Sequence, residues 1–436
     1  MNKEIQKSKM PSGIPYIIGN EAAERFSYYG MKAILVVFMT KYLMSSEGIL
    51  DTMSDQDAKF WMHIFVFALY FLPMIGSFLA DAIWGKYKTI MILSVVYCLG
   101  HLALALDETR IGLAVGLSLI AIGSGGIKPC VSAHVGDQFG EENQNLIPKV
   151  YSYFYWSINL GSAISLYLIP MILDEYNPSV AFGIPGLLML LATIVFWLGK
   201  RKYTHVEPVG VKQYFNTLTS KEGLSVIKKL SVIFAFMVVF WSLLDQTGSS
   251  LVLQADKMDR VLSFFGREFT ILPSQLQALN PIIIITLVPI LTFFVYPKIN
   301  WEPMKKIRIG MFLCVASFVV VALAEQQIQD GVETSILWQV AVYVIITIAE
   351  ILVYLTVLEF SYTQAPKALK SLVMALSLLS ISLGNLFTAV VNLFVTKDTL
   401  SGASYYWFFA FLMLVAAVLF VPVSKRYKEK TYVQDV

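Results

Sequence analysis

The stretch Glu21-Ala22-Ala23-Glu24-Arg25-Phe26 places three charged side chains inside a segment that otherwise has the apolar character of a membrane span. Residues three and four apart share one face of a helix, so Glu21, Glu24 and Arg25 project together toward one partner or cavity. An ionisable residue at membrane depth costs at least ~2.5–3.5 kcal/mol and typically marks an ion or substrate pathway. The alternative is a helix-end pair that reaches the membrane surface, but apolar sequence continues for roughly 15 residues beyond Arg25.

The composition of the 436-residue chain is that of a polytopic membrane protein. Hydrophobic residues make up 57% and charged residues 14%, against roughly 25% charged residues in soluble domains. The net charge of +3 is too small to indicate nucleic acid as a partner. Three cysteines lie in apolar segments and four histidines are scattered, which predicts no disulfide framework and no metal site. The polar start runs directly into the first span, unlike a cleavable signal peptide.

Apolar runs of roughly 20 residues predict about twelve transmembrane helices. We place them near residues 15–43, 58–82, 87–106, 110–134, 148–173, 180–199, 229–253, 272–297, 307–324, 335–360, 369–395 and 403–423. The resulting all-α membrane protein resembles the major facilitator superfamily, in which ligands bind near the midplane between two halves. Its predicted parts are an N-terminal six-helix bundle (1–199), a cytoplasmic linker (200–228) and a C-terminal six-helix bundle with a cytoplasmic tail (229–436).

Basic residues predict the orientation of the chain, because cytoplasmic loops carry an excess of Lys and Arg. They gather at the N-terminus, in alternate loops, in the linker and in the C-terminal tail, whereas the other loops are mainly acidic. Both termini are therefore predicted to be cytoplasmic, with the protein in a plasma or inner membrane. The charge run of the linker indicates a solvated face with a short amphipathic piece and no binding chemistry.

Further ionisable residues recur inside predicted spans of both halves, at His63, Lys128, Asp245 and Glu350. Lys128 follows the run Gly123-Ser124-Gly125-Gly126, whose glycines permit close helix approach. A lone buried lysine loses its proton, so a carboxylate or a substrate anion should face Lys128. A purely structural ion pair between two helices stays open. Glu350 has apolar neighbours on both sides and is expected to be functional.

Asp245 lies in an unusually polar patch of the seventh predicted span. The alternative is a structural role: Gln246 and Ser249 could form hydrogen bonds between helices, and Trp241 could pack in the hydrophobic core.

Five stretches resemble signatures of the proton-coupled oligopeptide transporter (POT/PTR) family. The first is Glu21-x-x-Glu24-Arg25-Phe26 followed by Tyr28-Tyr29-Gly30, and the others are residues 125–129 with 136–139, 154–162, 278–281 and 358–367. They follow the order of the family and span nearly the whole chain. The resemblance implies a peptide transporter of the major facilitator fold.

The resemblance also implies roles for individual residues. Arg25, Lys32 and Lys128 would bind the carboxylate of a peptide, and Glu350 with Asn159 and Asn280 would bind its amine. The cavity walls and side-chain pocket would be formed by Tyr28, Tyr29, Tyr70, Tyr155, Trp241 and Ser380. Extended chain advances about 3.3–3.6 Å per residue, so clamps at both ends would limit substrates to roughly two or three residues.

Proton coupling would involve Glu21, Glu24, Arg25 and His63. His63 stands seven residues before Tyr70, a spacing found in mammalian peptide transporters, although a lone histidine near a helix start is more often structural.

Among the departures from the common family pattern, three lie at implied site positions. Lys32 stands where many bacterial members have Arg, and Asp245 stands where Glu is commoner. The implied gate pair Lys32–Asp245 therefore keeps its two opposite charges but has side chains of different length and geometry. Ser377 replaces a common Trp near Ser380.

The predicted function is a symporter that imports di- and tripeptides with protons by alternating access. Protons are the coupling ion, and no cofactor is expected. Peptides and the lipid bilayer are the predicted partners, and a monomer suffices for transport. One alternative is a transporter of nitrate, another anion or a peptide-like drug. A polytopic membrane enzyme is the other alternative, and the sequence offers it no nucleophile–base or metal cluster.

Overall fold

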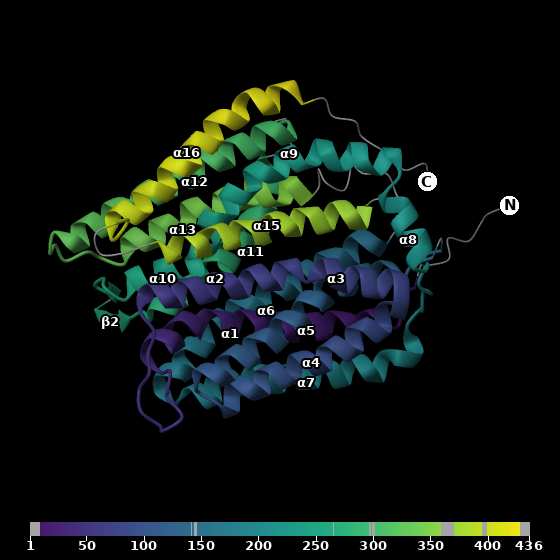
Figure 1. The fold of residues 1–436 in the computed structure, drawn as a ribbon, viewed down its shortest axis with the longest axis horizontal. Coiled ribbons are helices and arrows are strands. Elements are labelled where there is room, and N and C mark those ends of the chain that lie inside the picture. The colour runs from purple at the N-terminus through teal and green to yellow at the C-terminus, as the bar shows by residue number, and fades with distance from the viewer. Residues whose placement is uncertain are drawn as a thin grey trace.

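The computed structural model describes residues 9–140, 142–143, 146–264, 266–295, 298, 301–358, 370–394 and 399–427. In these residues the chain is almost entirely helical, and most helices run along one common direction (Figure 1). The first helices are α1 (Ile14–Lys41), α2 (Asp55–Phe71), α3 (Pro73–Phe78), α4 (Lys86–Leu106), α5 (Arg110–Gly136), α6 (Ile147–Glu175) and α7 (Pro178–Leu198). The later ones are α8 (Val211–Leu218), α9 (Lys221–Leu244), α10 (Ser250–Ala255), α11 (Leu279–Ile290), α12 (Pro303–Gln329), α13 (Leu337–Glu350), α15 (Lys370–Leu393) and α16 (Ala403–Arg426).

Eleven helices of the described residues are long and apolar enough to cross a membrane. α1 is not among them because Glu21, Glu24, Arg25 and Lys32 make it too charged. Its 28 residues nevertheless reach about 42 Å at 1.5 Å per residue, more than the ~30 Å of a bilayer core. The prediction of about twelve spans is confirmed.

The helices form two groups that lie one above the other in Figure 1. The first group, α1 to α7, and the second group, α9 to α16, each pack around a large hydrophobic core of their own. Between the groups, α2 contacts α15 and α6 contacts α11. The first turn of α1 and the last turn of α16 lie at the same end of the molecule, called here the end of the termini (Figure 1).

The connection between the groups contains α8, a short helix in the linker where a short amphipathic piece was predicted. The prediction of the next helix was wrong at its start, because α9 begins at Lys221 instead of near residue 229. Lys228 and Lys229 are exposed, so α9 extends as a polar helix beyond its apolar part, and hydropathy alone misses such an extension. The start of the connection is anchored to the first group, because Thr204 N donates to Gln138 Oε1 (2.9 Å) and Val209 N to Asp81 O (2.7 Å).

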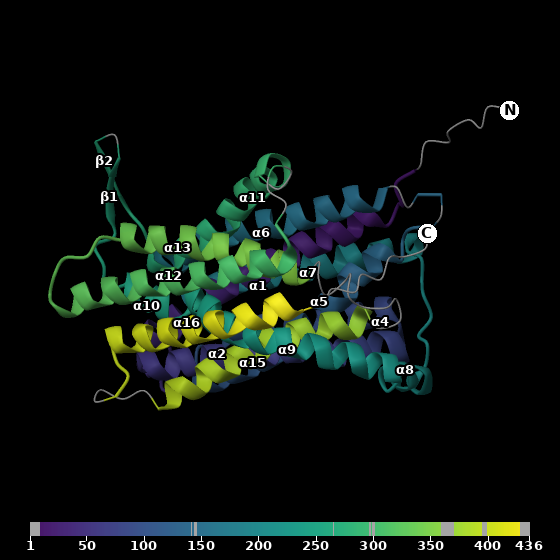
Figure 2. The same ribbon diagram turned by 90° about the horizontal axis from the view of Figure 1, so that it is seen from above.

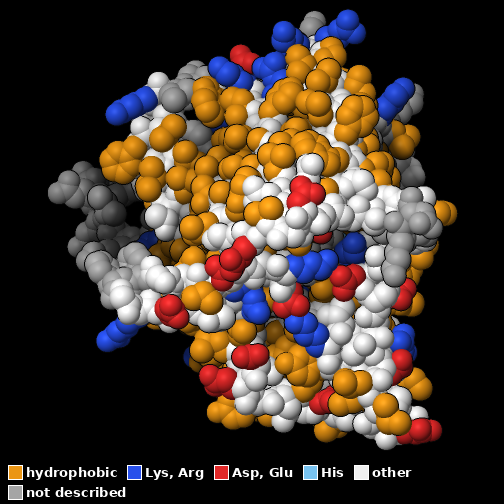
Figure 3. Space-filling view, turned by 90° about the vertical axis from the view of Figure 1, so that its left-hand side faces the viewer, with side chains coloured by type: hydrophobic (Ala, Val, Ile, Leu, Met, Phe, Trp, Pro, Cys, Tyr) orange, Lys and Arg blue, Asp and Glu red, His pale blue; other side chains and the backbone are white. Residues whose placement is uncertain are grey.

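The face opposite the termini carries a small antiparallel hairpin, β1 (Val261–Phe264) and β2 (Arg267–Thr270), which projects from the helices (Figure 2). On this face, acidic and basic side chains lie between two regions of hydrophobic side chains (Figure 3). Arg110 Nε lies 2.6 Å from Asp51 Oδ2, and these hydrogen bonds hold the pKa of the Asp51 carboxyl below its usual value.

Two ion pairs on this face join the groups. Lys41 Nζ lies 2.6 Å from Asp256 Oδ2, and Lys257 Nζ lies 3.9 Å from Asp55 Oδ2.

Candidate functional site

The charged stripe of α1 lies inside the first helix group. Arg25 Nε is 2.8 Å from Glu21 Oε1 and 2.7 Å from Glu24 Oε2. Arg25 is only 9% exposed, and Glu24 is fully buried. Glu21 and Arg25 are four residues apart and therefore share one helix face. One guanidinium is thus shared by two carboxylates, so a single negative charge is in excess when all three groups are ionised.

Ser124 of α5 completes this cluster, because its Oγ donates a hydrogen bond of 2.8 Å to Glu24 Oε1. The surrounding glycines allow α5 to come this close. A Cβ on Gly123 would lie 2.7 Å from the backbone nitrogen of Tyr97 in α4, and one on Gly125 would lie 2.8 Å from the carbonyl oxygen of Leu69 in α2. Side chains at these two positions would push the helices apart.

Lys128, one turn further along α5, is enclosed by aromatic rings. Its Nζ lies 4.2 Å from the ring centroid of Tyr28 and 4.3 Å from that of Tyr70. Within the described part of the chain it has no hydrogen-bond partner and no carboxylate within 4.0 Å. Ring faces stabilise a cation only partly. Glu24 and Glu21 therefore attract Lys128 only from beyond contact distance, and its ammonium has no direct anionic partner among the described residues.

Glu350 lies at the end of α13 in the second group, where the helix continues as a π-helical turn over Ile351–Leu355. Such turns are frequent at functional sites. Asn280 of α11 donates a hydrogen bond of 2.6 Å from Nδ2 to Glu350 Oε2 and lies 3.2 Å from Thr347 Oγ1. Among the described residues, no cationic side chain lies within 4.0 Å of Glu350. Its negative charge is therefore held by an amide alone.

Aromatic rings from both groups lie near these charges. Tyr29 packs edge-to-face on Tyr28, with ring centroids 5.0 Å apart. In the second group, Trp241 of α9 packs edge-to-face on Tyr354 of the π-helical turn at 5.5 Å.

Two predicted polar residues make hydrogen bonds within their own helices. Asn159 Nδ2 donates to the carbonyl of Tyr155 in α6 (2.9 Å), and Ser380 Oγ donates to the carbonyl of Ser377 in α15 (2.6 Å). The amide oxygen of Asn159 and the lone pairs of Ser380 Oγ keep capacity to accept from a ligand.

A chain of polar contacts joins the two groups on the side of these residues that faces away from the termini. Lys32 Nζ lies 3.4 Å from Asp245 Oδ1, and Asn385 Nδ2 donates to Asp245 Oδ2 at 2.7 Å. Asn385 Oδ1 lies 2.7 Å from His63 Nδ1, and His63 Nε2 lies 2.9 Å from Ser249 Oγ. His63 is thus placed in this chain of contacts and is fully enclosed by both groups.

The hydrogen bonds of Asn385 fix the tautomer of His63. Its Nδ2 donates to Asp245 and to the carbonyl of Ile381, so its Oδ1 must accept. The histidine therefore carries a proton on Nδ1, and in the neutral ring Nε2 accepts from Ser249 Oγ.

The sequence pattern of the POT family matches residues 87–218 and 206–408. The chain belongs to the POT family. Solute carrier family 15 member 2 of Rattus norvegicus is 36% identical over 379 residues, which cover 74% of this chain and 50% of the relative. Peptide transporter family 1 of Drosophila melanogaster is 33% identical over 372 residues, which cover 74% and 48%. The chain spans about half the length of the curated relatives it matches.

Solved structures of the POT family share the fold of this chain. The crystal structure of an auto-inhibited POT family peptide transporter has a TM-score of 0.86 and 33% identity, and the match covers 98% of this chain and 99% of that one. The POT family transporter PepTSo has a TM-score of 0.84 and 34% identity, with 96% and 98% covered. These likenesses confirm the predicted all-helical fold of the major facilitator type. Both solved relatives are transporters by name, which favours transport over the alternative of a membrane enzyme.

Several contacts of this POT family site were not predicted from the sequence. Ser124 and Asn385 each hydrogen-bond a predicted site residue, and Tyr354 packs on Trp241. Ser249, for which the sequence offered a hydrogen bond between helices as the alternative role, makes one to His63. A polar residue within an apolar span is a usable signal for Asn385, whereas a serine or tyrosine gives none. The predicted signature 358–367 lies outside the described residues except for residue 358.

Proposed function

We propose that this POT family chain is a symporter that imports di- and tripeptides together with protons by alternating access. The observation that carries the proposal is a pair of unmatched charges. Lys128 in the first group has no carboxylate partner, and Glu350 in the second group has no cationic partner, in the described part of the chain. A peptide zwitterion supplies the missing charge to each.

The proposed binding set combines both ends of the peptide with adaptable walls. Arg25, Lys32 and Lys128 bind the carboxylate, and Glu350 with Asn159 and Asn280 binds the amine. The walls and side-chain pocket are formed by Tyr28, Tyr29, Tyr70, Tyr155, Trp241 and Ser380, with Asp245 paired to Lys32 as the gate. The spacing between the clamps selects two or three residues, because extended chain advances about 3.3–3.6 Å per residue.

Proton coupling would act through the guanidinium of Arg25. Two carboxylates hold Arg25 in the structure. Protonation of Glu21 or Glu24 removes one of these attractions, and Arg25 then becomes available to the peptide carboxylate. Loss of the proton on the other side of the membrane returns Arg25 to the carboxylates and weakens its hold on the peptide. The place of His63 between the groups supports a part in the same coupling.

The proposed orientation puts both termini in the cytoplasm of a plasma or inner membrane, as the distribution of Lys and Arg predicts. The polar contacts between the groups then lie toward the outside, which supports a state closed to the outside. In this scheme residues 1–199 and 229–436 act as two units joined by the linker 200–228, and a monomer suffices.

Transport in proteoliposomes tests the proposal. Vesicles with an imposed inward proton gradient and a negative interior potential are offered labelled dialanine, trialanine, tetraalanine and free alanine. Dialanine and trialanine should accumulate above equilibrium, and both should stop accumulating when an ionophore collapses the gradient. Uptake of tetraalanine or free alanine at the rate of dialanine would contradict the two-ended clamp, and uptake of nitrate in place of peptide would support the alternative solute.

A further inference from the structure

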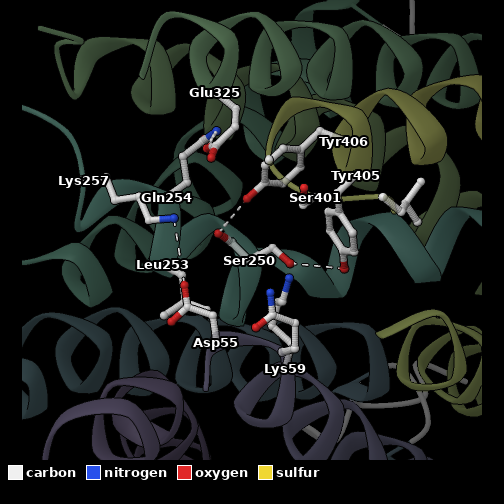
Figure 4. A pocket seen from close by; sticks show the side chains of 13 residues that line it. Asp55, Lys59, Ser250, Leu253, Gln254, Lys257, Glu325, Ser401, Tyr405 and Tyr406 are labelled. Atoms are coloured by element: carbon white, nitrogen blue, oxygen red, sulfur yellow. Dashed lines mark hydrogen bonds and ion pairs between the residues drawn. The ribbon is translucent and has the colours of Figure 1, made fainter. Parts of the chain in front are cut away.

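A second cavity lies beyond the gate, at the face opposite the termini. It opens between α2 of the first group and α10, α12 and α16 of the second (Figure 4). Ser250 lines this cavity, whereas its neighbour Ser249 bonds His63 in the chain of contacts described above. The cavity is therefore separated from the proposed peptide site by the gate.

Lys59 brings an unmatched positive charge into this cavity from α2. The side chain points into the cavity beside Tyr405 (Figure 4), and its Nζ lies 4.1 Å from the centroid of the tyrosine ring. Lys59 is only 9% exposed, and no carboxylate of the described residues lies within 4.0 Å of it. Asp55, one turn earlier on the same helix face, and Glu325 attract this ammonium only from beyond 4.0 Å, and a ring face compensates only part of the lost hydration.

Glu325 brings an unmatched negative charge from α12 on the other side of the cavity (Figure 4). It is 5% exposed, and Gln254 Nε2 donates a hydrogen bond of 2.9 Å to its Oε2. Gln254 is itself held by Gln339, whose Nε2 donates to Gln254 Oε1 at 2.9 Å. These partners are neutral amides, and the described residues place no cation within 4.0 Å of Glu325.

The two other charged residues that line the cavity lie at its mouth and pair with each other. Asp55 and Lys257 are about half exposed and lie 3.9 Å apart. The interior therefore presents one cation from the first group and one anion from the second. The cavity volume is about 80 Å³, several times the roughly 10–15 Å³ that one water molecule requires on the same measure. A small molecule of a few heavy atoms fits, whereas a tripeptide does not.

We propose that this cavity binds a small α-amino acid as a zwitterion, with its carboxylate on Lys59 and its ammonium on Glu325. Ser250 Oγ and the phenol of Tyr405, which lie 3.4 Å apart, offer further hydrogen bonds to the carboxylate. The ligand contacts both helix groups, so it holds this face closed and is a modulator, not a transported substrate. The binding itself does not depend on the proposed peptide transport, and only the assignment of this face to the outside rests on it.

Calorimetric titration of the purified transporter with L-alanine tests the site. The Glu350→Gln background weakens amine binding at the proposed peptide site and so isolates the second cavity. In this background Lys59→Gln and Glu325→Gln should each weaken alanine binding by about tenfold or more, because each leaves the opposite buried charge unpaired. The matched control is Arg110→Gln, which removes a cation of the same face that lies outside the cavity and pairs with Asp51 of its own group, and it should leave alanine affinity unchanged.

Blocked ligands provide a test without any variant in the cavity. N-acetylalanine lacks the ammonium and alanine amide lacks the carboxylate, so each should bind about tenfold more weakly than alanine or worse. Equal affinity for all three ligands, equal affinity of the cavity variants and the control, or no saturable alanine binding would each overturn the proposal. Dialanine uptake by Lys59→Gln reports separately on folding and on the proposed peptide transport.

Discussion

His63 Nδ1 lies 2.7 Å from Asn385 Oδ1, and this contact joins α2 of the first group to α15 of the second. The same asparagine donates to Asp245, so one amide connects the histidine to the Lys32–Asp245 ion pair. The three residues can therefore respond to one another's protonation through Asn385.

The first prediction concerns this amide. Asn385→Asp replaces the donor to Asp245 with a second carboxylate at the same place, and two buried carboxylates repel each other or take up a proton. We expect uphill dialanine uptake in proteoliposomes to fall by about tenfold or more. Thr388→Val is the matched control on α15, because the Thr388 hydroxyl donates to the backbone carbonyls of Ser242 in α9 and Gly384 in α15 and contacts none of the three residues. Normal uptake by Asn385→Asp would show that the contact has no part in the cycle.

The second prediction concerns the two carboxylates that hold Arg25. Glu21→Gln and Glu24→Gln should each abolish accumulation of dialanine, because a neutral amide resembles the protonated acid and cannot release a proton. Exchange of labelled for unlabelled peptide without a gradient should survive. Glu47→Gln, in an exposed loop, serves as the control. Wild-type rates of uphill uptake in both variants would refute the coupling assignment.

The third prediction separates the two ends of the peptide. Acetylation of the peptide amine should weaken binding less in Glu350→Gln than in the wild type, because the partner charge of the amine is already missing. Amidation of the peptide carboxylate should weaken binding equally in both proteins. Lys128→Gln should show the reverse. Truncation of one member of a desolvated charge pair typically costs about 2–5 kcal/mol, so the cross-over is measurable by competition with labelled dialanine. Identical penalties in all three proteins would mean that the peptide does not bind in this orientation.

The fourth prediction concerns the linker. Residues 210–220 lie beyond the anchoring hydrogen bonds of Thr204 and Val209, and they should carry no binding chemistry. A neutral Gly/Ser segment of equal length should leave dialanine affinity unchanged, with a lower yield of protein because α8 is lost. A large loss of affinity would contradict this.

The fifth prediction concerns the pH dependence of stability at the exposed loop. Hydrogen bonds from Arg110 lower the pKa of Asp51, so the folded protein binds a proton there less readily than the unfolded chain. The stabilisation is present above the unfolded-state pKa and is lost as the pH falls through the lower folded-state pKa. Asp51→Asn should therefore lower the melting temperature slightly at neutral pH, and the difference should vanish in acid. A difference that persists in acid would point to another cause.

The membrane spans were predictable because a bilayer leaves few alternatives to long apolar helices. The stripe of α1 was equally readable, since Glu21 and Arg25 pair within one helix. Contacts between segments that are far apart in the sequence could not be predicted. His63 and Asn385 are 322 residues apart, and a single sequence contains no signal that pairs them. The polar extension of α9 was missed because hydropathy reports only its apolar part.

The polar contacts at the face opposite the termini bear on how the proposed symporter can be driven. A net hydrogen bond contributes about 0.5–1.5 kcal/mol, and the contacts of Lys32, His63 and Lys41 with the second group are few. One proton that moves through 100 mV releases about 2.3 kcal/mol, and one pH unit adds about 1.36 kcal/mol. Breaking these polar contacts therefore requires energy of the same order as one or two protons supply. A cycle balanced in this way is reversible, so under the proposed symport an inverted proton gradient should make the same protein expel peptides.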